Sequence, residues 1–288
     1  MPRTAWVALG AASISSPLWA PMQTGAGTRT ITRMTRPLSS FDYRCFLDDP
    51  DRLEVPVNFV TRPLPELVEP SSMPSVAVPA ALDHEPMVPI THRNIRVLQP
   101  YYHVGWNEAR PGAFVRSGVA ERIARVAENL PAGFGLAVLD AWRPLPLQAE
   151  IYDAAYADSS LPEGFVSQPS SDPTTPPPHL TGGCLDVTLT WQGRPLALGS
   201  AFDDFTDEAR ADSYEATPGR VRQLRRLLYW AMRDQDFIVI DCEWWHYEIG
   251  TRRWGAITDN TPFYGAADIV LSDERHTDRY RIISRPSI

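Results

Sequence analysis

The chain has 288 residues, which is enough for one large domain or for one domain with an appendage, and its apolar (43%) and charged (22%) fractions are those of an ordinary soluble globular protein. Its formal net charge is −8, and it contains no Lys. An acidic chain without a basic run lacks the cationic surface that nucleic acid requires, so no nucleic-acid partner is expected.

The N-terminal region shows no sustained hydrophobic period. Residues 1–40 are rich in Thr, Ser, Gly and Pro, and we predict that they are poorly ordered. The apolar run Ala5–Ala20 faintly resembles a secretory signal, although Ser13 and Pro17 interrupt it. An alternative is that translation begins at Met34. No stretch of the chain approaches the ~20 apolar residues of a membrane span.

Three cysteines, Cys45, Cys184 and Cys242, are too few and too odd in number for a disulfide framework. Their spacing also matches no cysteine-based zinc site. We therefore interpret them as reduced thiols, which favours a cytoplasmic protein, with export as the alternative. The sequence does not indicate an oligomeric state.

The next region, residues 41–89, is predicted to be an extended arm that wraps on a domain formed by residues 90–288. Proline favours extended backbone in itself and in the residue before it. The arm contains Pro at six positions: Pro56, Pro63, Pro65, Pro70, Pro74 and Pro79.

The sequence predicts regular helices and strands beyond the arm. Apolar residues at helical spacing predict a helix over 115–130, namely Val115, Val119, Ile123, Val126 and Leu130. The apolar run 134–139 predicts a buried strand, and a second helix is expected over 145–156.

The second half alternates hairpins with a helix. Residues 184–190 predict a strand, with Gln192-Gly193 as the turn of a hairpin that returns over 195–198. Thr217-Pro218 predicts the start of a third helix, with Thr as N-cap and Pro at the first helical position. Another strand is expected over 237–240. The absence of a regular βαβ alternation predicts an α+β fold, with a small antiparallel sheet, flanking helices and a metal site in a cleft.

Three short polar segments lie at the ends of predicted apolar strands: AWRP at 141–144, HLTGGCLD at 179–186 and EWWH at 243–246. Strand ends are rigid, so they can present such side chains to a cleft. Together the segments supply two His, one Asp, one Glu and one Arg. This set suffices for metal-assisted hydrolysis, which needs three protein ligands, an open position for water, a base and a cation.

Strand geometry restricts how these residues can meet. Side chains alternate between the faces of a strand, so Glu243 and His246 can share one metal only if the backbone bends between them or if Glu243 precedes the strand. Likewise, His179 must lie in the loop before the strand that carries Asp186. Gly182-Gly183 suits the bend, because glycine tolerates strained dihedrals.

The same alternation assigns faces to the strand over 184–190. Leu185 and Val187 would face the core, while Asp186 faces the cleft. Cys184 then shares the face of Asp186 and lines the cleft, with thiolate ligation as an alternative. Taken singly, each motif also has a plain structural interpretation: a surface Glu–His pair, a strand-end Asp, or an Arg that braces a carboxylate. Their conjunction favours chemistry.

That conjunction resembles the D-alanyl-D-alanine dipeptidases of the vancomycin-resistance type, within the wider family of zinc D,D-peptidases. The resemblance extends from about Arg96 to Gly250 and rests on motifs in the same order. These are a helix, a strand ending in DAWRP, the pattern H-x-x-G-x-C-x-D, AFDDF at 201–205 and EWWHY. It implies the α+β fold of zinc D-Ala-D-Ala metallopeptidases and hedgehog-like proteins.

The resemblance also implies roles for individual residues. One zinc ion per chain would be bound by His179, Asp186 and His246. Glu243 would be the catalytic base, and Arg143 would polarise the scissile carbonyl. Asp203, in the AFDDF segment, would help to form the substrate site.

Two positions depart from the family pattern. Pro177 stands where the family usually has Ser, two residues before the first His, and Cys184 stands where Ala is common. Neither departure removes a ligand, but both bear on the substrate loop and on specificity. The remaining histidines lack ligand spacing and are expected to be ordinary hydrogen-bonded residues: His84, His92, His103 and His276.

The implied activity is hydrolysis of D-alanyl-D-alanine or a related small dipeptide by a metal-activated water. One alternative is a D,D- or L,D-carboxypeptidase that trims longer cell-wall peptides. Another is an inactive zinc-binding relative that acts as a recognition module. The presence of both Arg143 and Glu243 disfavours the inactive relative, because binding alone requires neither.

Overall fold

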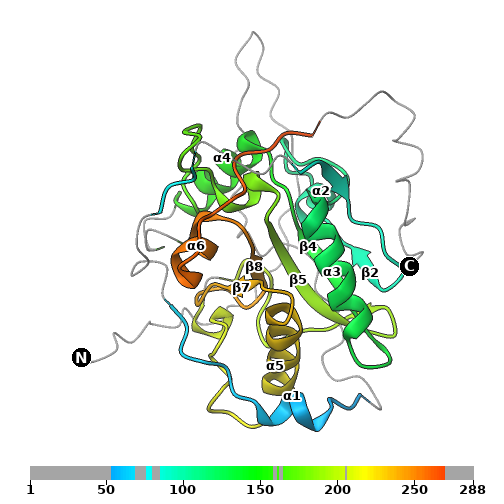
Figure 1. Ribbon diagram of the computed structural model, residues 1–288. Coiled ribbons are helices and arrows are strands. Elements are labelled where there is room, and N and C mark those ends of the chain that lie inside the picture. The colour runs from blue at the N-terminus through cyan, green and yellow to red at the C-terminus, as the bar shows by residue number, and fades with distance from the viewer. Residues whose placement is uncertain are drawn as a thin grey trace.

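A mixed sheet lies at the centre of the computed structural model, which describes residues 53–68, 76–79, 85–157, 161, 165–204 and 206–269 (Figure 1). Several predictions concern residues outside these ranges. They are the segment 1–40 with the alternative start at Met34, the arm residues 41–52, 69–75 and 80–84, and the residues Cys45, His84 and His276.

The sheet has six strands. They are, in spatial order, β2 (Ile95–Val97), β4 (Phe134–Asp140), β5 (Cys184–Trp191), β8 (His246–Glu248) and β7 (Ile238–Val239), while β6 (Arg194–Pro195) pairs with β5. A separate ribbon consists of β1 (Met87–Pro89) and β3 (Phe114–Arg116). The mixed α+β architecture agrees with the prediction. The sheet is antiparallel as expected, except that β2 runs parallel to β4. A parallel pair requires a long crossover, and the chain between these two strands supplies one.

Helices flank the sheet (Figure 1). They are α1 (Val57–Thr61), α2 (Pro100–Val104), α3 (Ser117–Asn129), α4 (Leu145–Ala155), α5 (Arg220–Arg233) and α6 (Arg252–Thr258), with short 3-10 helices η3 (Pro178–Thr181) and η4 (Asp207–Ala209). The predictions of a strand over 134–139 and a helix over 145–156 are therefore confirmed to within a residue.

The main core lies between the sheet and helices α3 and α5, which contact each other and strands β4 and β5. Along β5, Leu185 and Val187 belong to this core, as predicted, while Asp186 lies on the alternate face. Burial of each large aliphatic side chain contributes roughly 1.5–3 kcal/mol of transfer free energy. This packing fixes the strand whose first residues belong to the polar cluster described below.

Helix α3 begins two residues later than the spacing predicts. Val115 belongs to β3, where it pairs with Val88 of β1. The helix starts at Ser117 because the preceding backbone bonds elsewhere, with the Arg116 N–H donating to the Gly182 carbonyl at 3.0 Å. The Glu85 carboxylate accepts from the Gly118 N–H at 2.5 Å and so satisfies one unpaired donor of the helix start.

Helix α5 also begins later than predicted, at Arg220, with Gly219 as its N-cap. The prediction that Thr217 caps this helix is wrong. The N–H of Thr217 donates to the carbonyl of Tyr214 at 3.0 Å, so Thr217 closes the preceding turn. The predicted turn is confirmed: Gln192 and Gly193 both have positive φ, the geometry of a tight turn between β5 and β6. The returning strand is Arg194–Pro195 and not 195–198, although the Leu196 N–H still donates to the Leu189 carbonyl at 2.9 Å.

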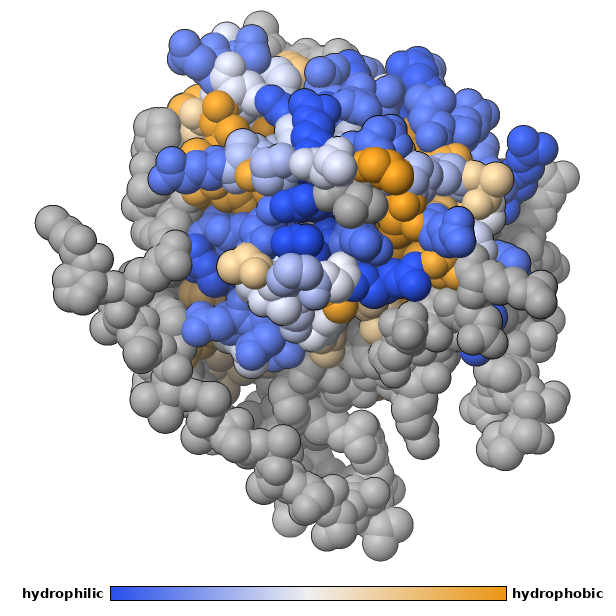
Figure 2. All heavy atoms as spheres, turned by 90° about the horizontal axis from the view of Figure 1, so that it is seen from below, coloured by the Kyte–Doolittle hydropathy of each residue, from blue (hydrophilic) through white to orange (hydrophobic). Residues whose placement is uncertain are grey.

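The first described stretch of the arm packs on α5. Helix α1 contacts α5, and Leu53 is buried in the core. The guanidinium of Arg62 lies over the ring of Trp230, whose Nε1 donates to the Arg62 carbonyl at 3.1 Å. Seen from below, where α1 and α5 lie, the described surface is mostly hydrophilic with hydrophobic areas interspersed (Figure 2). The division of the chain at residues 40 and 89 stays a prediction. Among the described helices, none is both long and apolar enough to cross a membrane.

Candidate metal centre

The ends of three adjacent strands bring polar residues together. In the strand register, Asp186 of β5 lies opposite His246 of β8 on one side and Asp140 of β4 on the other. A register shift between Val138 and Asp140 bends the end of β4 at this point. The alternation along β5 directs the Asp186 side chain away from the core, and only 2% of the residue is exposed.

His179 approaches Asp186 from the 3-10 turn η3 that precedes β5, as expected for a residue in the loop before the strand. Gly182 makes the predicted bend with a φ of 72°. The Nδ1 of His179 lies 2.7 Å from the Ala141 carbonyl oxygen, which makes Nδ1 the donor. The lone pair of Nε2 is then free, and Nε2 lies 3.4 Å from Oδ2 of Asp186.

His246 is oriented by a hydrogen bond from Nε2, whereas His179 uses Nδ1. Its Nε2 lies 2.7 Å from Oε1 of Glu248, and its Nδ1 lies 3.1 Å from Oδ1 of Asp186. A carboxylate that accepts from one ring nitrogen fixes the tautomer and leaves the other nitrogen available as a ligand. The candidate ligand atoms are therefore Nε2 of His179, a carboxylate oxygen of Asp186 and Nδ1 of His246.

These atoms fit a divalent cation. Among the described residues, Oδ1 of Asp186 is one of few buried side-chain atoms without a hydrogen-bond partner. Potential ligand atoms of Asp186, Glu243 and His246 lie within 4.8 Å of one another, as do those of Asp140, His179 and Asp186. Two imidazoles and one carboxylate are a known donor set for catalytic zinc.

The electrostatics also favour a cation. Burial by itself lowers the pKa of His179, but Cys184 and Asp186 outweigh burial and raise that pKa to about 10. The pKa of Asp186 is lowered below its usual range, because the two histidines counteract the effect of burial. The cluster thus stabilises positive charge at the point where the three ligands meet.

Glu243 lies in the turn before β8, which is one of the two arrangements predicted for it. Its Oε2 is 3.4 Å from Nδ1 of His246, so it borders the same side of the ring as Asp186. Burial raises the pKa of Glu243, and Asp186 raises it further. A carboxylate with a raised pKa holds a transferred proton more readily than an exposed one.

Arg143 is held in place by two neighbours. Its Nε donates to Oδ2 of Asp140 at 2.8 Å, and its NH1 donates to Oε1 of Gln148 at 3.0 Å. Its NH2 reaches to 3.9 Å from Asp186. Although burial opposes the charged form, Asp140 and Asp186 raise the pKa of Arg143 above its usual value, so the guanidinium remains a rigid cation beside the candidate ligands.

Asp203 lies at another wall of the pocket. The hydroxyl of Tyr101 donates to Oδ2 of Asp203 at 2.6 Å. Burial raises the pKa of Asp203 well above its ordinary value, in spite of this hydrogen bond. The raised pKa favours the protonated form of this carboxyl group.

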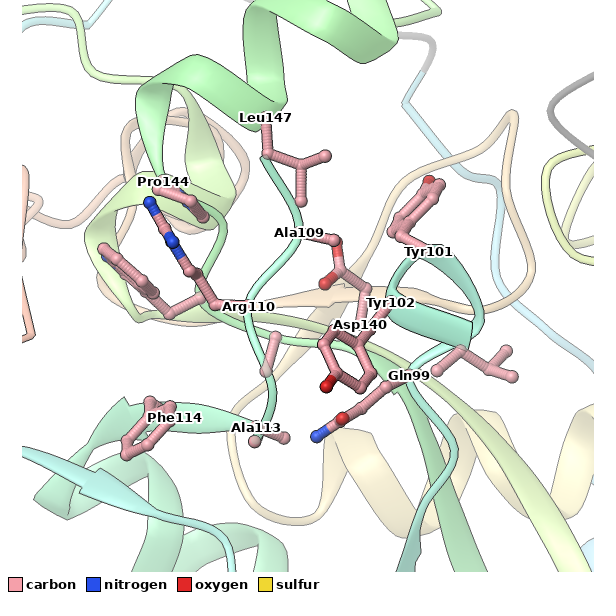
Figure 3. Close-up of a pocket in the computed structure, with 14 residues that line it drawn as sticks. Gln99, Tyr101, Tyr102, Ala109, Arg110, Ala113, Phe114, Asp140, Pro144 and Leu147 are labelled. Atoms are coloured by element: carbon pink, nitrogen blue, oxygen red, sulfur yellow. The ribbon is translucent and has the colours of Figure 1, made fainter. Parts of the chain in front are cut away.

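One pocket brings together all six residues that the sequence singled out: Arg143, His179, Asp186, Asp203, Glu243 and His246. A second cavity also has Tyr101 in its lining, together with Asp140, whose carboxylate accepts from Arg143 (Figure 3). Of the remaining described histidines, His92 and His103 lie outside the pocket.

Sequence reasoning missed four residues that hold this site together: Asp140, Gln148, Glu248 and Arg253. A signal existed for Glu248, since it is two residues after His246 on one strand and so shares its face. Asp140 and Gln148 are close to Arg143 in the sequence, but their contacts with it depend on how the chain turns between β4 and α4, and the contact of Arg253 with Ser167 joins distant segments. Cys184 shares the face of Asp186, as predicted, with Sγ 3.3 Å from Nε2 of His246, the nitrogen turned toward Glu248. It is fully buried behind that ring, however, and does not line the pocket as expected.

Comparison with known proteins matches residues 113–263 to a peptidase family described as D-ala-D-ala dipeptidase. The chain is 28% identical over 218 residues to a D-alanyl-D-alanine dipeptidase of Synechocystis sp., an alignment that covers 63% of this chain and 88% of that protein. It is 30% identical over 119 residues to a D-alanyl-D-alanine dipeptidase of Escherichia coli K12, covering 41% of this chain and 56% of that protein.

Proposed function

The chain belongs to the D-ala-D-ala dipeptidase family of peptidases, and we propose that it hydrolyses D-alanyl-D-alanine or a closely related dipeptide with one zinc ion per chain. His179, Asp186 and His246 would hold the zinc. The observation that carries the proposal is the convergence of these three residues with Glu243 and Arg143 in one buried pocket. The relatives from Synechocystis sp. and Escherichia coli, both named as D-alanyl-D-alanine dipeptidases, support the same substrate.

The ligand set supports zinc as the metal. Three protein ligands leave a fourth position open, as in other catalytic zinc sites. When bound, zinc would act as a Lewis acid toward the peptide carbonyl and lower the pKa of a bound water to about 7. The hydrogen bonds from His179 to the Ala141 carbonyl and from His246 to the Glu248 carboxylate keep both imidazoles in the required orientation.

Glu243 is the proposed general base. Its carboxylate faces the ligands from within 3.4 Å of Nδ1 of His246, and its raised pKa favours acceptance of a proton. Glu243 would take the proton of the attacking water and pass it to the leaving amine. Glu243 is only 8% exposed, so little bulk water competes for the proton that it would hold.

Arg143 is proposed to stabilise the negative charge that develops on the carbonyl oxygen. Asp140 and Gln148 hold its guanidinium in place before substrate arrives, so little reorganisation is needed in the transition state. Loss of one such donor costs roughly 3–4 kcal/mol in comparable sites. Asp203, with Tyr101, is proposed to contribute to substrate binding.

A direct assay tests this function. Zinc-loaded protein is expected to release D-alanine from D-alanyl-D-alanine, to act more slowly on longer cell-wall peptides, and to lose activity in the presence of a chelator. Faster cleavage of the longer peptides would replace the dipeptidase by a carboxypeptidase. A zinc-loaded protein that binds these peptides but cleaves none of them would be a recognition module.

The role of Arg143 separates an enzyme from a binder. Arg143→Ala is expected to lower kcat by roughly two to three orders of magnitude with little change in KM, because the charge appears mainly in the transition state. Lys at this position should restore activity only in part, since it cannot reproduce a two-pronged donor. A raised KM with unchanged kcat would instead mean that Arg143 grips a carboxylate of the bound substrate.

A further inference from the structure

Arg253 is a second arginine of the pocket, and the mechanism above does not use it. It lies in the first turn of α6, which Thr251 caps by accepting from the N–H of Trp254 at 3.2 Å. The Arg253 side chain is 19% exposed and lines the same pocket as the candidate metal ligands. A largely buried guanidinium is costly unless anions or hydrogen-bond acceptors surround it.

The partners of Arg253 only partly satisfy it. Its NH1 lies 3.3 Å from Oε1 of Glu248, and its NH2 donates to Oγ of Ser167 at 3.0 Å. A guanidinium carries five N–H donors, and these are its two hydrogen bonds within the described chain. The Glu248 oxygen is engaged more closely by His246, at 2.7 Å. The contact of 3.3 Å is long for a charge-assisted hydrogen bond, so Glu248 is not a dedicated partner of Arg253.

Ser167 supplies a second donor beside this guanidinium. Its carbonyl oxygen accepts from Nε2 of Gln148 at 2.6 Å, which holds the loop in place against the pocket. Its Oγ accepts from Arg253, so the hydroxyl proton of Ser167 remains available to a ligand. Gln148 also holds Arg143, and one chain of hydrogen bonds therefore links the two arginines of the pocket.

We propose that Arg253 and Ser167 form a subsite for the free C-terminal carboxylate of the peptide substrate. The proposal rests on the proposed peptidase function and names a determinant of its specificity. A guanidinium beside a hydroxyl matches the geometry of a carboxylate, which accepts from both. In a dipeptide the terminal carboxylate is only a few bonds from the scissile carbonyl carbon. Arg253 is correspondingly close to the metal centre, because the same oxygen of Glu248 contacts both its guanidinium and His246.

The subsite restricts the substrate class. A peptide whose C-terminal residue follows the scissile bond directly can place its carboxylate against Arg253, whereas a peptide that continues beyond that residue places a neutral amide there. The remaining N–H groups of the guanidinium then gain no anionic acceptor, which disfavours binding. The enzyme should therefore remove a single C-terminal residue and discriminate against C-terminal amides.

The test compares D-alanyl-D-alanine with D-alanyl-D-alaninamide, which differ only in the terminal charge. The zinc-loaded wild type is expected to prefer the free acid by roughly 10- to 100-fold in kcat/KM, the effect of a hydrogen bond to a charged group. Arg253→Gln should reduce this preference to within about threefold, chiefly through a higher KM for the acid. Ser167→Ala, which leaves the contact between Arg253 and Glu248 in place, should weaken the preference by a smaller factor.

Arg252→Gln is the matched control. Arg252 is the neighbouring residue of the same helix, donates to the carbonyl of Val76 and does not line the pocket, so this variant should keep the preference for the free acid. Zinc content and melting temperature of each variant are measured in parallel. Equal losses on both substrates in Arg253→Gln, or a preserved preference, would overturn the subsite while the wild-type activity stands. Failure of the zinc-loaded wild type to cleave either substrate would overturn the proposed function itself.

Discussion

Two buried glutamates lie on opposite sides of the His246 ring, and their pKa values are shifted in opposite directions. On the Nδ1 side, Glu243 faces the pocket, and burial raises its pKa. On the Nε2 side, burial would likewise raise the pKa of Glu248, but hydrogen bonds from His246 and Thr251 and the charge of Arg253 lower it to about 2. Both carboxylates lie within three residues of His246 in the sequence.

The difference shows that hydrogen-bond donors and nearby charges, and not burial alone, decide whether the pKa of a buried carboxylate is raised or lowered. Glu248 is saturated with donors and remains an anion, so it can orient a ligand but cannot accept a proton at neutral pH. Glu243 has few donors around it, so it retains the capacity to accept one. The predictions below test this contrast, beginning with the residue that both glutamates flank.

The largest effect is expected for His246→Ala, which removes the ring itself. The variant should lose the zinc, about one ion per chain in the wild type, and with it all measurable turnover, because two remaining ligands do not hold a catalytic zinc. Metal analysis after gel filtration would show this. His179→Ala serves as the parallel variant, and full zinc occupancy in both would contradict the ligand assignment.

On the Nδ1 side, Glu243→Gln should lower kcat by roughly two to four orders of magnitude, the usual contribution of a general base, while the fold and the zinc content stay unchanged. The amide keeps the size of the side chain but cannot accept the proton. Turnover within tenfold of wild type would show that another group is the base.

On the Nε2 side, Glu248→Gln should weaken zinc binding but change kcat little. We expect zinc affinity to fall by roughly 10- to 100-fold, as for other carboxylates that support a histidine ligand. At saturating zinc, kcat should change far less than in Glu243→Gln. Competition with a chromogenic chelator measures the affinity. Equal effects of the two substitutions on both quantities would abolish the contrast between the two sides.

The smallest effect is expected for Cys184→Ala. Cys184 contacts Nε2 of His246, the nitrogen that Glu248 already engages, so loss of the thiol should change zinc affinity by less than about threefold. Cys184→Ser is the conservative comparison. A drop in affinity as large as that of Glu248→Gln would instead make the thiolate a ligand, an arrangement that the proximity of Cys184 to both histidines leaves open to experiment.

Much of this architecture could be predicted from the sequence. The apolar run that forms β4 and the alternation along β5 depend on period and composition alone, so both elements and the outward face of Asp186 could be predicted. Gly193 suits its positive φ, so the position of the turn could be predicted from the sequence. The spacing of Glu243 and His246 likewise required a bend, because the side-chain period of a strand is two.

Contacts between distant segments decided the rest. Helix α3 begins late because the backbone before it bonds to Gly182, a distant partner that no local pattern reveals, whereas α5 begins late because Thr217 closes a local turn with Tyr214. The parallel pairing of β2 with β4 depends on the packing of the intervening crossover. Glu248 and Arg253 acquire their roles from neighbours brought together by the fold. A hydrogen bond lowers or raises a pKa only once both partners are in place, so sequence names the chemical groups, and tertiary structure sets their charge and orientation.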